Sequence, residues 1–170
     1  RKIRNTARFI LGNLDGFDPN TDCVADDQLQ EIDRWALAAL DDLMVNTSAG
    51  YAVYDFNKVY HAVYNFCVVA MSNFYLDVTK DRLYCTNGAG RKAAQTTMYK
   101  ILVALDKIIA PILCFTSQEI WDFMPKTEGM NKYVVFEQMP KAGQYAADDA
   151  FKAKWAQLIA VRDEVKKVLE

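Results

Sequence analysis

Residues 55–75 read DFNKVYHAVYNFCVVAMSNFY. On a helix drawn through this segment, apolar side chains fall on nearly every side, and only Lys58, His61, Asn65 and Ser72 form a narrow polar strip. A helix that is apolar almost all round packs in the middle of a helical protein. The segment therefore predicts a buried helix over 55–75, surrounded by other helices.

The segments on both sides show the period of amphipathic helices. Apolar residues recur at three- and four-residue steps over 1–14, 27–43, 92–110 and 149–170, and Pro111 stops the third of these patterns. We therefore expect an all-α fold, a helical bundle. The segment 133–138 departs from this helical period.

Domain organisation follows from the same patterns. The segment 133–138 is expected to be a short strand or extended strap, ended by Pro140. We expect a bundle domain over 1–147 and a C-terminal helix over 148–170. Both ends of the chain lie inside helical patterns, so the chain is expected to be a fragment of a longer protein.

Two helix starts carry local signals. Asp27 is a candidate N-cap for the second helix, because its carboxylate can accept from free backbone amides. Thr116-Ser-Gln-Glu119 matches a capping box, and Phe115 with Ile120 matches a hydrophobic staple around it. The sequence therefore predicts that one helix begins at Asp27 and another at Thr116.

Composition is that of an ordinary globular protein. The 170 residues are 52% hydrophobic and 25% charged, which fits one domain with its own core. No apolar run is long enough to span a bilayer and no signal peptide opens the chain, so no membrane partner is expected. We expect a cytoplasmic protein.

The four cysteines lie far apart, without any Cys-x-x-Cys pair, at Cys23, Cys67, Cys85 and Cys114. This spacing argues against a zinc site or a thiol redox motif, so we expect no metal site. Buried free thiols are the favoured interpretation.

No catalytic constellation is visible, so no catalytic residue is assigned. The single histidine, His61, leaves no partners for a histidine-based triad or metal cluster. Gly88-Ala-Gly90 lacks the rest of a phosphate-binding fingerprint, so a plain turn is favoured. An independent small enzyme is therefore improbable.

Charge is balanced overall but uneven along the chain. The formal net charge is −2, from 20 basic and 22 acidic side chains. Residues 1–8 hold four basic residues and no acid, and Arg1, Arg4 and Arg8 follow helical steps that place them on one face. Such a stripe suits phosphate, but taken alone it is better explained as a simple solvated face, because exposed runs of charge are common.

Several strings resemble one family, the class I isoleucyl-tRNA synthetases of bacterial type, in the region that binds the anticodon. The strings are RKIRNTARFILGNL at the start, EIDRWAL, NKVYHAVYNFCVVAMSNFYLDVTKDRLYC, RKAAQTTMYKILVALDKIIAPILCFTSQEIW and WAQLIAVRDEVKKVLE. They cover nearly the whole chain in the family's order. Valyl- and leucyl-tRNA synthetases share the scaffold and stay as alternatives, as does a helical protein-interaction module.

The resemblance implies a role in binding the anticodon stem-loop of isoleucine tRNA. The parent enzyme joins isoleucine to its tRNA with ATP and magnesium, and its catalytic domain, editing domain and frequent zinc-binding C-terminal element lie outside this sequence. It also implies a monomeric parent, with the catalytic domain of the same chain as a partner. Within this context the expected RNA contacts are Arg1, Lys2, Arg4, Asn5 and Arg8, then Lys80, Arg82, Arg91 and Lys92, with Tyr84 as a stacking platform.

Overall fold

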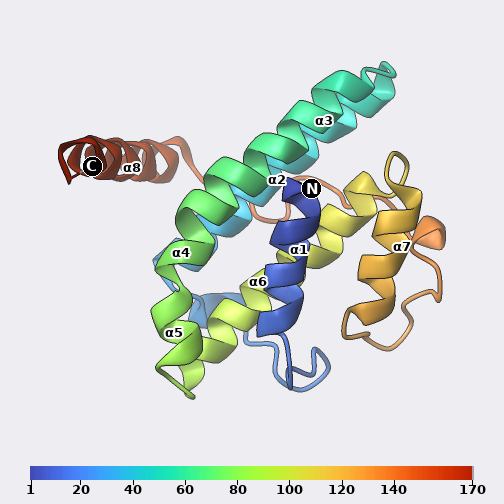
Figure 1. The fold of residues 1–170 in the computed structure, drawn as a ribbon, viewed down its shortest axis with the longest axis horizontal. Helices are drawn as coiled ribbons and strands as arrows, with labels where there is room; N and C mark the ends of the chain where they lie inside the picture. The colour runs from blue at the N-terminus through green and yellow to red at the C-terminus, as the bar shows by residue number, and fades with distance from the viewer. Residues whose placement is uncertain (170) are drawn as a thin grey trace.

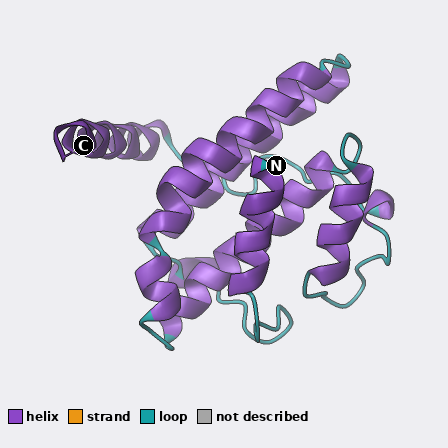
Figure 2. Cartoon of the chain, in the orientation of Figure 1, coloured by secondary structure: helices purple, strands orange, loops and turns teal. Residues whose placement is uncertain are grey.

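The computed structural model describes residues 1–169, which form helices joined by turns and loops, with no strand in that range (Figures 1 and 2). The prediction of an all-α helical bundle is confirmed. The elements in chain order are α1 (Lys2–Asn13), the 3₁₀ turn η1 (Asp26–Gln28), α2 (Glu31–Ala52), α3 (Phe56–Asn65), the π-helical η2 (Phe66–Tyr75), α4 (Leu76–Val78), α5 (Lys80–Tyr84), α6 (Ala89–Ile109), α7 (Cys114–Phe123), the 3₁₀ turn η3 (Val134–Phe136) and α8 (Asp149–Leu169).

The helix predicted over 55–75 is present as α3 followed by η2. It begins where Asp55 accepts a hydrogen bond from the backbone nitrogen of Lys58, at 2.9 Å. The prediction that this helix is buried on all sides is wrong, because Phe56, Tyr60 and Val69 are about half exposed. The reason is visible in Figure 1: α2 and α3 run side by side, and their joined end extends beyond the other helices.

α2 and α3 approach closely because Gly50 has no side chain. A Cβ atom at that position would lie 2.8 Å from Cγ2 of Val59, closer than real side chains come. Further along the same helical pair, η2 packs against α1 and α2 through Cys67 and Met71, which are fully buried. The core therefore lies where α1, α2, η2 and α6 meet.

α6 supplies the long central support of the bundle. Most of its residues are buried, from Ala93 through Ile109, and it contacts α1, α2, α5 and α7. Gln95 on α6 donates to the carbonyl oxygen of Asn13 at 2.9 Å, which ties α6 to the C-terminal end of α1. α1 therefore lies on a rigid base (Figure 1).

The two predicted helix starts are wrong. α2 begins at Glu31 rather than Asp27, and Asp33 accepts from the backbone nitrogen of Gln30 at 3.1 Å. α7 begins at Cys114, which places Thr116 inside the helix. The proposed staple fails as well, since Phe115 is 89% exposed.

Tertiary contacts explain the shifted start of α7. The hydroxyl of Ser117 donates to Asp106 on α6 at 2.5 Å, and Glu119 accepts from Arg4 on α1. Glu119 of the predicted capping box thus binds α1, and its neighbour Ser117 binds α6.

The extended strap expected near 133–138 is also corrected. Val134–Phe136 is a 3₁₀ turn, and only its flanking residues Tyr133 and Glu137 have extended backbone. Val134 is buried, and its backbone nitrogen donates to the side chain of Gln118 at 3.1 Å. A side chain, not a partner strand, therefore satisfies this backbone group.

A buried ion pair joins four parts of the chain. Both terminal nitrogens of Arg82 on α5 donate to Asp33 on α2, at 2.9 and 2.8 Å, and Asp33 is fully buried. The hydroxyl of Tyr75 donates to the same carboxylate at 2.7 Å. Arg82 also donates to the carbonyl oxygen of Gly90 on α6 at 2.8 Å. We call Asp33, Tyr75, Arg82 and Gly90 the Asp33 lock.

We predict that Asp33→Ala lowers the free energy of unfolding by about 3 to 5 kcal/mol, because it leaves the guanidinium of Arg82 largely buried and unpaired. The matched control is Asp26→Ala, which breaks the more exposed pair with Lys100 and should cost less than about 1 kcal/mol. Urea denaturation measures both. Equal losses in the two variants would contradict the role of the lock.

Asp106 is a second buried carboxyl group, at the contact of α6 with α7. Its residue is 1% exposed, its Oδ1 accepts from Ser117, and its Oδ2 has no partner within residues 1–169. Burial raises the pKa of Asp106 to about 7, against smaller opposing effects of Ser117 and the Lys126 cation. The folded protein therefore favours the neutral acid at this position.

We predict that Asp106 makes stability fall as pH rises. Its pKa is near 3.9 in the unfolded chain and about 7 in the folded one, so its stabilising contribution is complete below pH 4 and lost by pH 8. Asp106→Asn mimics the neutral acid and should remove this loss, which amounts to up to about 4 kcal/mol. Urea denaturation of both proteins at pH 4 and pH 8 tests this. Parallel pH dependences would show that Asp106 does not titrate as described.

Candidate nucleic-acid interface

The outer face of α1 carries a row of polar and cationic side chains. Ile3, Ala7 and Ile10 face the core and are buried. The opposite positions, which are all exposed, are Arg1, Lys2, Arg4, Asn5 and Arg8. We call these five residues the α1 surface. The helical period that buries one face therefore presents the other to solvent.

One of the arginines in the α1 surface already has an acidic partner. Nη2 of Arg4 lies 2.5 Å from Oε1 of Glu119 on α7, and both side chains are about half exposed. Arg1, Lys2 and Arg8 have no ion pair with any residue in the range 1–169. The α1 surface thus keeps a positive field, reduced at one position.

Arg8 lies between two surface hollows. On one side, α1 and α7 enclose a hollow of about 670 Å³ that Arg4, Glu119 and Phe123 also line. On the other side, α1 and α5 enclose a hollow of about 460 Å³ that Asn5 and Tyr84 also line. The structure thus brings Tyr84 to the α1 surface.

The other cations expected from the sequence are held by neighbours. Lys80 pairs with Asp77 at 2.9 Å, and Lys92 pairs with Asp22 at 2.7 Å. Arg82 belongs to the Asp33 lock, so its guanidinium is committed to protein groups.

Arg91 is likewise held by a neighbour, since its guanidinium donates to the side chain of Asn87 at 3.2 Å. Arg82 is the clearest departure from expectation. Its donors face inward to a carboxylate and a carbonyl oxygen, and not outward as expected of an RNA contact.

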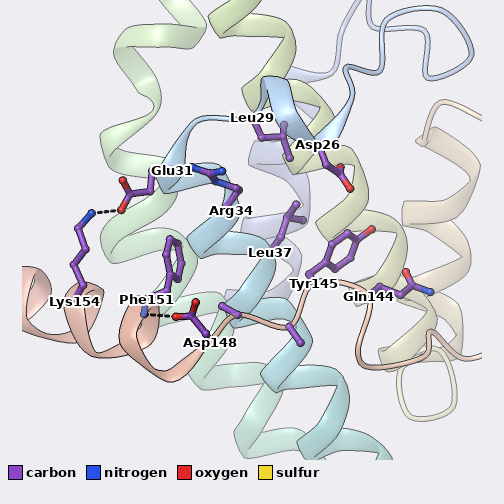
Figure 3. A pocket seen from close by; sticks show the side chains of 12 residues that line it. Asp26, Leu29, Glu31, Arg34, Leu37, Gln144, Tyr145, Asp148, Phe151 and Lys154 are labelled. Atoms are coloured by element: carbon purple, nitrogen blue, oxygen red, sulfur yellow. Dashed lines mark hydrogen bonds and ion pairs between the residues drawn. The ribbon is translucent and has the colours of Figure 1, made fainter.

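A further hollow, drawn in Figure 3, lies between α2 and the start of α8 and measures about 540 Å³. Its charged lining residues are Asp26, Glu31, Asp148, Arg34 and Lys154, and Lys154 pairs with Glu31 at 2.5 Å. Because acidic groups outnumber basic ones, this hollow does not attract a polyanion.

Two residues that line the hollow beside Arg4 and Arg8 are not predicted by the sequence. Glu119 was assigned to a helix cap, and Phe123, which is 75% exposed, was not considered. Glu119 pairs with a residue 115 positions away, and no local pattern signals such a contact. The exposed phenylalanine had a weak signal, because it lies one turn beyond Glu119 on the predicted helix.

The thiols differ from expectation. Cys67 is buried, and burial raises the pKa of its thiol to about 12. Cys23, Cys85 and Cys114 are exposed, so the prediction of buried thiols is wrong for these three. Cys23 lies in a loop, Cys85 follows α5, and Cys114 starts α7, and such positions leave side chains open to solvent.

Two negative findings concern the part of the chain that the structure describes. It contains no group of three or more His, Cys, Asp or Glu residues that could hold a metal ion. None of its helices combines the length and apolar character needed to cross a membrane.

Comparisons with known proteins agree with one another. The chain is 51% identical to an isoleucine–tRNA ligase of Syntrophotalea carbinolica, 49% to one of Caldicellulosiruptor saccharolyticus and 45% to one of Bacillus mycoides. Each match covers 100% of this chain but only 18 or 19% of the relative, so the chain spans less than a fifth of these ligases. The family model described as the anticodon-binding domain of tRNA ligase matches residues 33–170. The chain therefore belongs to the anticodon-binding domain family of tRNA ligases.

Proposed function

We propose that this chain is the part of an isoleucine–tRNA ligase that binds the anticodon stem-loop of isoleucine tRNA. The observation that carries the proposal is the α1 surface, where Arg1, Lys2 and Arg8 are exposed without acidic partners in the described range. Because the relatives named above are isoleucine–tRNA ligases, we propose isoleucine tRNA, and not valine or leucine tRNA, as the ligand.

In this proposal, cationic side chains bind the RNA backbone, and aromatic and amide side chains recognise its bases. The guanidinium groups of the α1 surface suit phosphate oxygens, whose contacts set the position of the RNA along the protein. Loop bases that leave the helical stack can then meet aromatic and amide side chains, which distinguish one base from another. The packed base of α1 on α6 keeps these groups in place.

In this proposal, the aminoacylation reaction takes place in other domains of the longer ligase. ATP and magnesium would act in its catalytic domain, and any zinc-binding element would lie toward its C-terminal part. The catalytic domain of the same ligase chain is a proposed partner. We also propose that this parent ligase is monomeric and cytoplasmic. The division of the present chain at 147/148 stays a prediction. So do the individual RNA contacts, Lys80, Arg91 and Lys92 included.

A titration with three RNAs tests the assignment. Filter binding at low salt compares tRNAs for isoleucine, valine and leucine on the 170-residue chain. We expect the isoleucine tRNA to bind most tightly, with affinity that falls steeply as salt rises. Equal affinities would contradict the isoleucine assignment. The lack of binding to all three would favour a protein-interaction role instead.

Arg8→Ala should weaken tRNA binding and reduce the slope of log affinity against log salt by about 1, as expected for one lost phosphate contact. Lys141→Ala is the matched control, because it removes the same charge from an exposed loop residue outside the α1 surface. It should leave the slope unchanged. If both variants change the slope equally, binding follows net charge and not this surface.

Glu119→Gln should strengthen tRNA binding, because it frees Arg4 for phosphate and removes a repelling carboxylate from the same hollow. Glu164→Gln provides the control, since Glu164 also pairs with one exposed cation, Lys167, but on α8. The same filter assay measures both variants. Weaker binding in Glu119→Gln would mean that the ion pair itself shapes the RNA-binding surface.

A further inference from the structure

The hollow between α1 and α5 has the shape of a small open pocket beside the cationic stripe. It measures about 460 Å³. Its lining residues are Asn5, Arg8, Phe9, Gly12, Asn13 and Tyr84. Five of these come from the outer face of α1, and Tyr84 closes the opposite side from the end of α5.

Three polar groups in this hollow lack partners within the described part of the chain. They are the amide of Asn5, the guanidinium of Arg8 and the hydroxyl of Tyr84, none of which takes part in a side-chain hydrogen bond there. Asn13 differs, because its amide donates to the carbonyl oxygen of Phe9 at 2.8 Å. The hollow therefore offers one amide, one cation and one phenol to a ligand.

The apolar surface of the hollow is aromatic. Tyr84 is 64% exposed, and Phe9 is partly buried beneath the same opening. Gly12 leaves its wall open, since a Cβ atom there would meet nothing within 4 Å. An exposed aromatic ring beside a guanidinium and an amide is the set of groups that proteins use to stack an unpaired base, bind its edge and hold its phosphate.

The backbone segment that carries Tyr84 is held in position by the Asp33 lock. α5 has only five residues, too few to be stable as a helix without tertiary contacts. Leu83 anchors it in the core, and Arg82, two residues before Tyr84, is bound to α2 and α6. The aromatic side of the hollow is thus arranged before a ligand arrives, which lowers the entropy lost on binding.

We propose that this hollow is a subsite for a single unpaired nucleobase of RNA, stacked on Tyr84, with its edge on the amide of Asn5 and its phosphate on Arg8. The neighbouring hollow between α1 and α7 is less suitable, because the carboxylate of Glu119 there opposes a phosphate. The assignment rests on the proposed function and adds the class of group that this part of the surface binds.

A double-mutant cycle between protein and RNA tests the subsite. The probe is the anticodon stem-loop of isoleucine tRNA, prepared with an abasic nucleotide at each loop position in turn, and fluorescence anisotropy measures its affinity. One abasic position should weaken binding to the unchanged protein by about tenfold or more, as a lost stacked base does. The same position should cost much less in Tyr84→Ala, where only the contact with Asn5 is left to lose. Tyr84→Phe, which keeps the ring, should behave like the unchanged protein.

Gly12→Leu separates occupancy of the hollow from damage to the fold. Leucine is a better helix former than glycine and meets no clash at its Cβ, so the unfolding temperature should rise by a few degrees. Gly12 lines both hollows beside Arg8, so a leucine side chain there would occupy part of them and should weaken binding of the intact stem-loop. Binding that stays unchanged in Gly12→Leu, or an abasic effect of undiminished size in Tyr84→Ala, overturns the subsite.

Lys2→Ala distinguishes failure of the subsite from failure of the proposed function. Lys2 belongs to the α1 surface but does not line the hollow. If Lys2→Ala weakens RNA binding while Tyr84→Ala and Gly12→Leu do not, the surface binds RNA but the hollow holds no base. If none of the three variants changes RNA binding, both proposals are wrong.

Discussion

The carboxylate of Asp33 lies at the point where α2, η2, α5 and α6 meet, and it is fully removed from solvent. A charge in such a position is tolerated only when its oxygens are bound on all sides. Arg82, Tyr75 and the backbone of Gln30 supply these bonds, from three different parts of the chain. The directions of the bonds set where α5 lies against the ends of α2 and α6. The position of α5 in turn sets where Tyr84, at its C-terminal end, lies on the surface.

The packing of α1 depends on the other side of the same core. α1 contacts η2 and α6 along a face of small and branched residues, so its outward face is determined by the helical period. Gln95 ties its C-terminal end to α6. Two independently anchored elements, α1 and α5, therefore meet at a surface that neither could form alone. This explains why residues as distant in sequence as Arg8 and Tyr84 share one hollow.

Much of the fold could be predicted from periodicity alone, because burial on one face leaves a repeating trace in the sequence. The buried face of α1 and the long helix α6 are examples. Errors arose where a side chain serves a distant partner. Thr116 and Glu119 have the spacing of a local capping box, but Glu119 binds Arg4 on α1. Arg82 resembles a surface cation but binds Asp33. For the interface, the cationic face of α1 was visible in the sequence. Its partial neutralisation by Glu119 was not.

The pairing of Arg4 with Glu119 affects how fast a bound anion would leave this position. Any anion that binds Arg4 would displace the carboxylate of Glu119, which could return as that anion leaves. The exchange avoids a bare cation at every stage, so the barrier to dissociation is lower than at an arginine that must regain only water. A surface built in this way favours short residence of a bound anion.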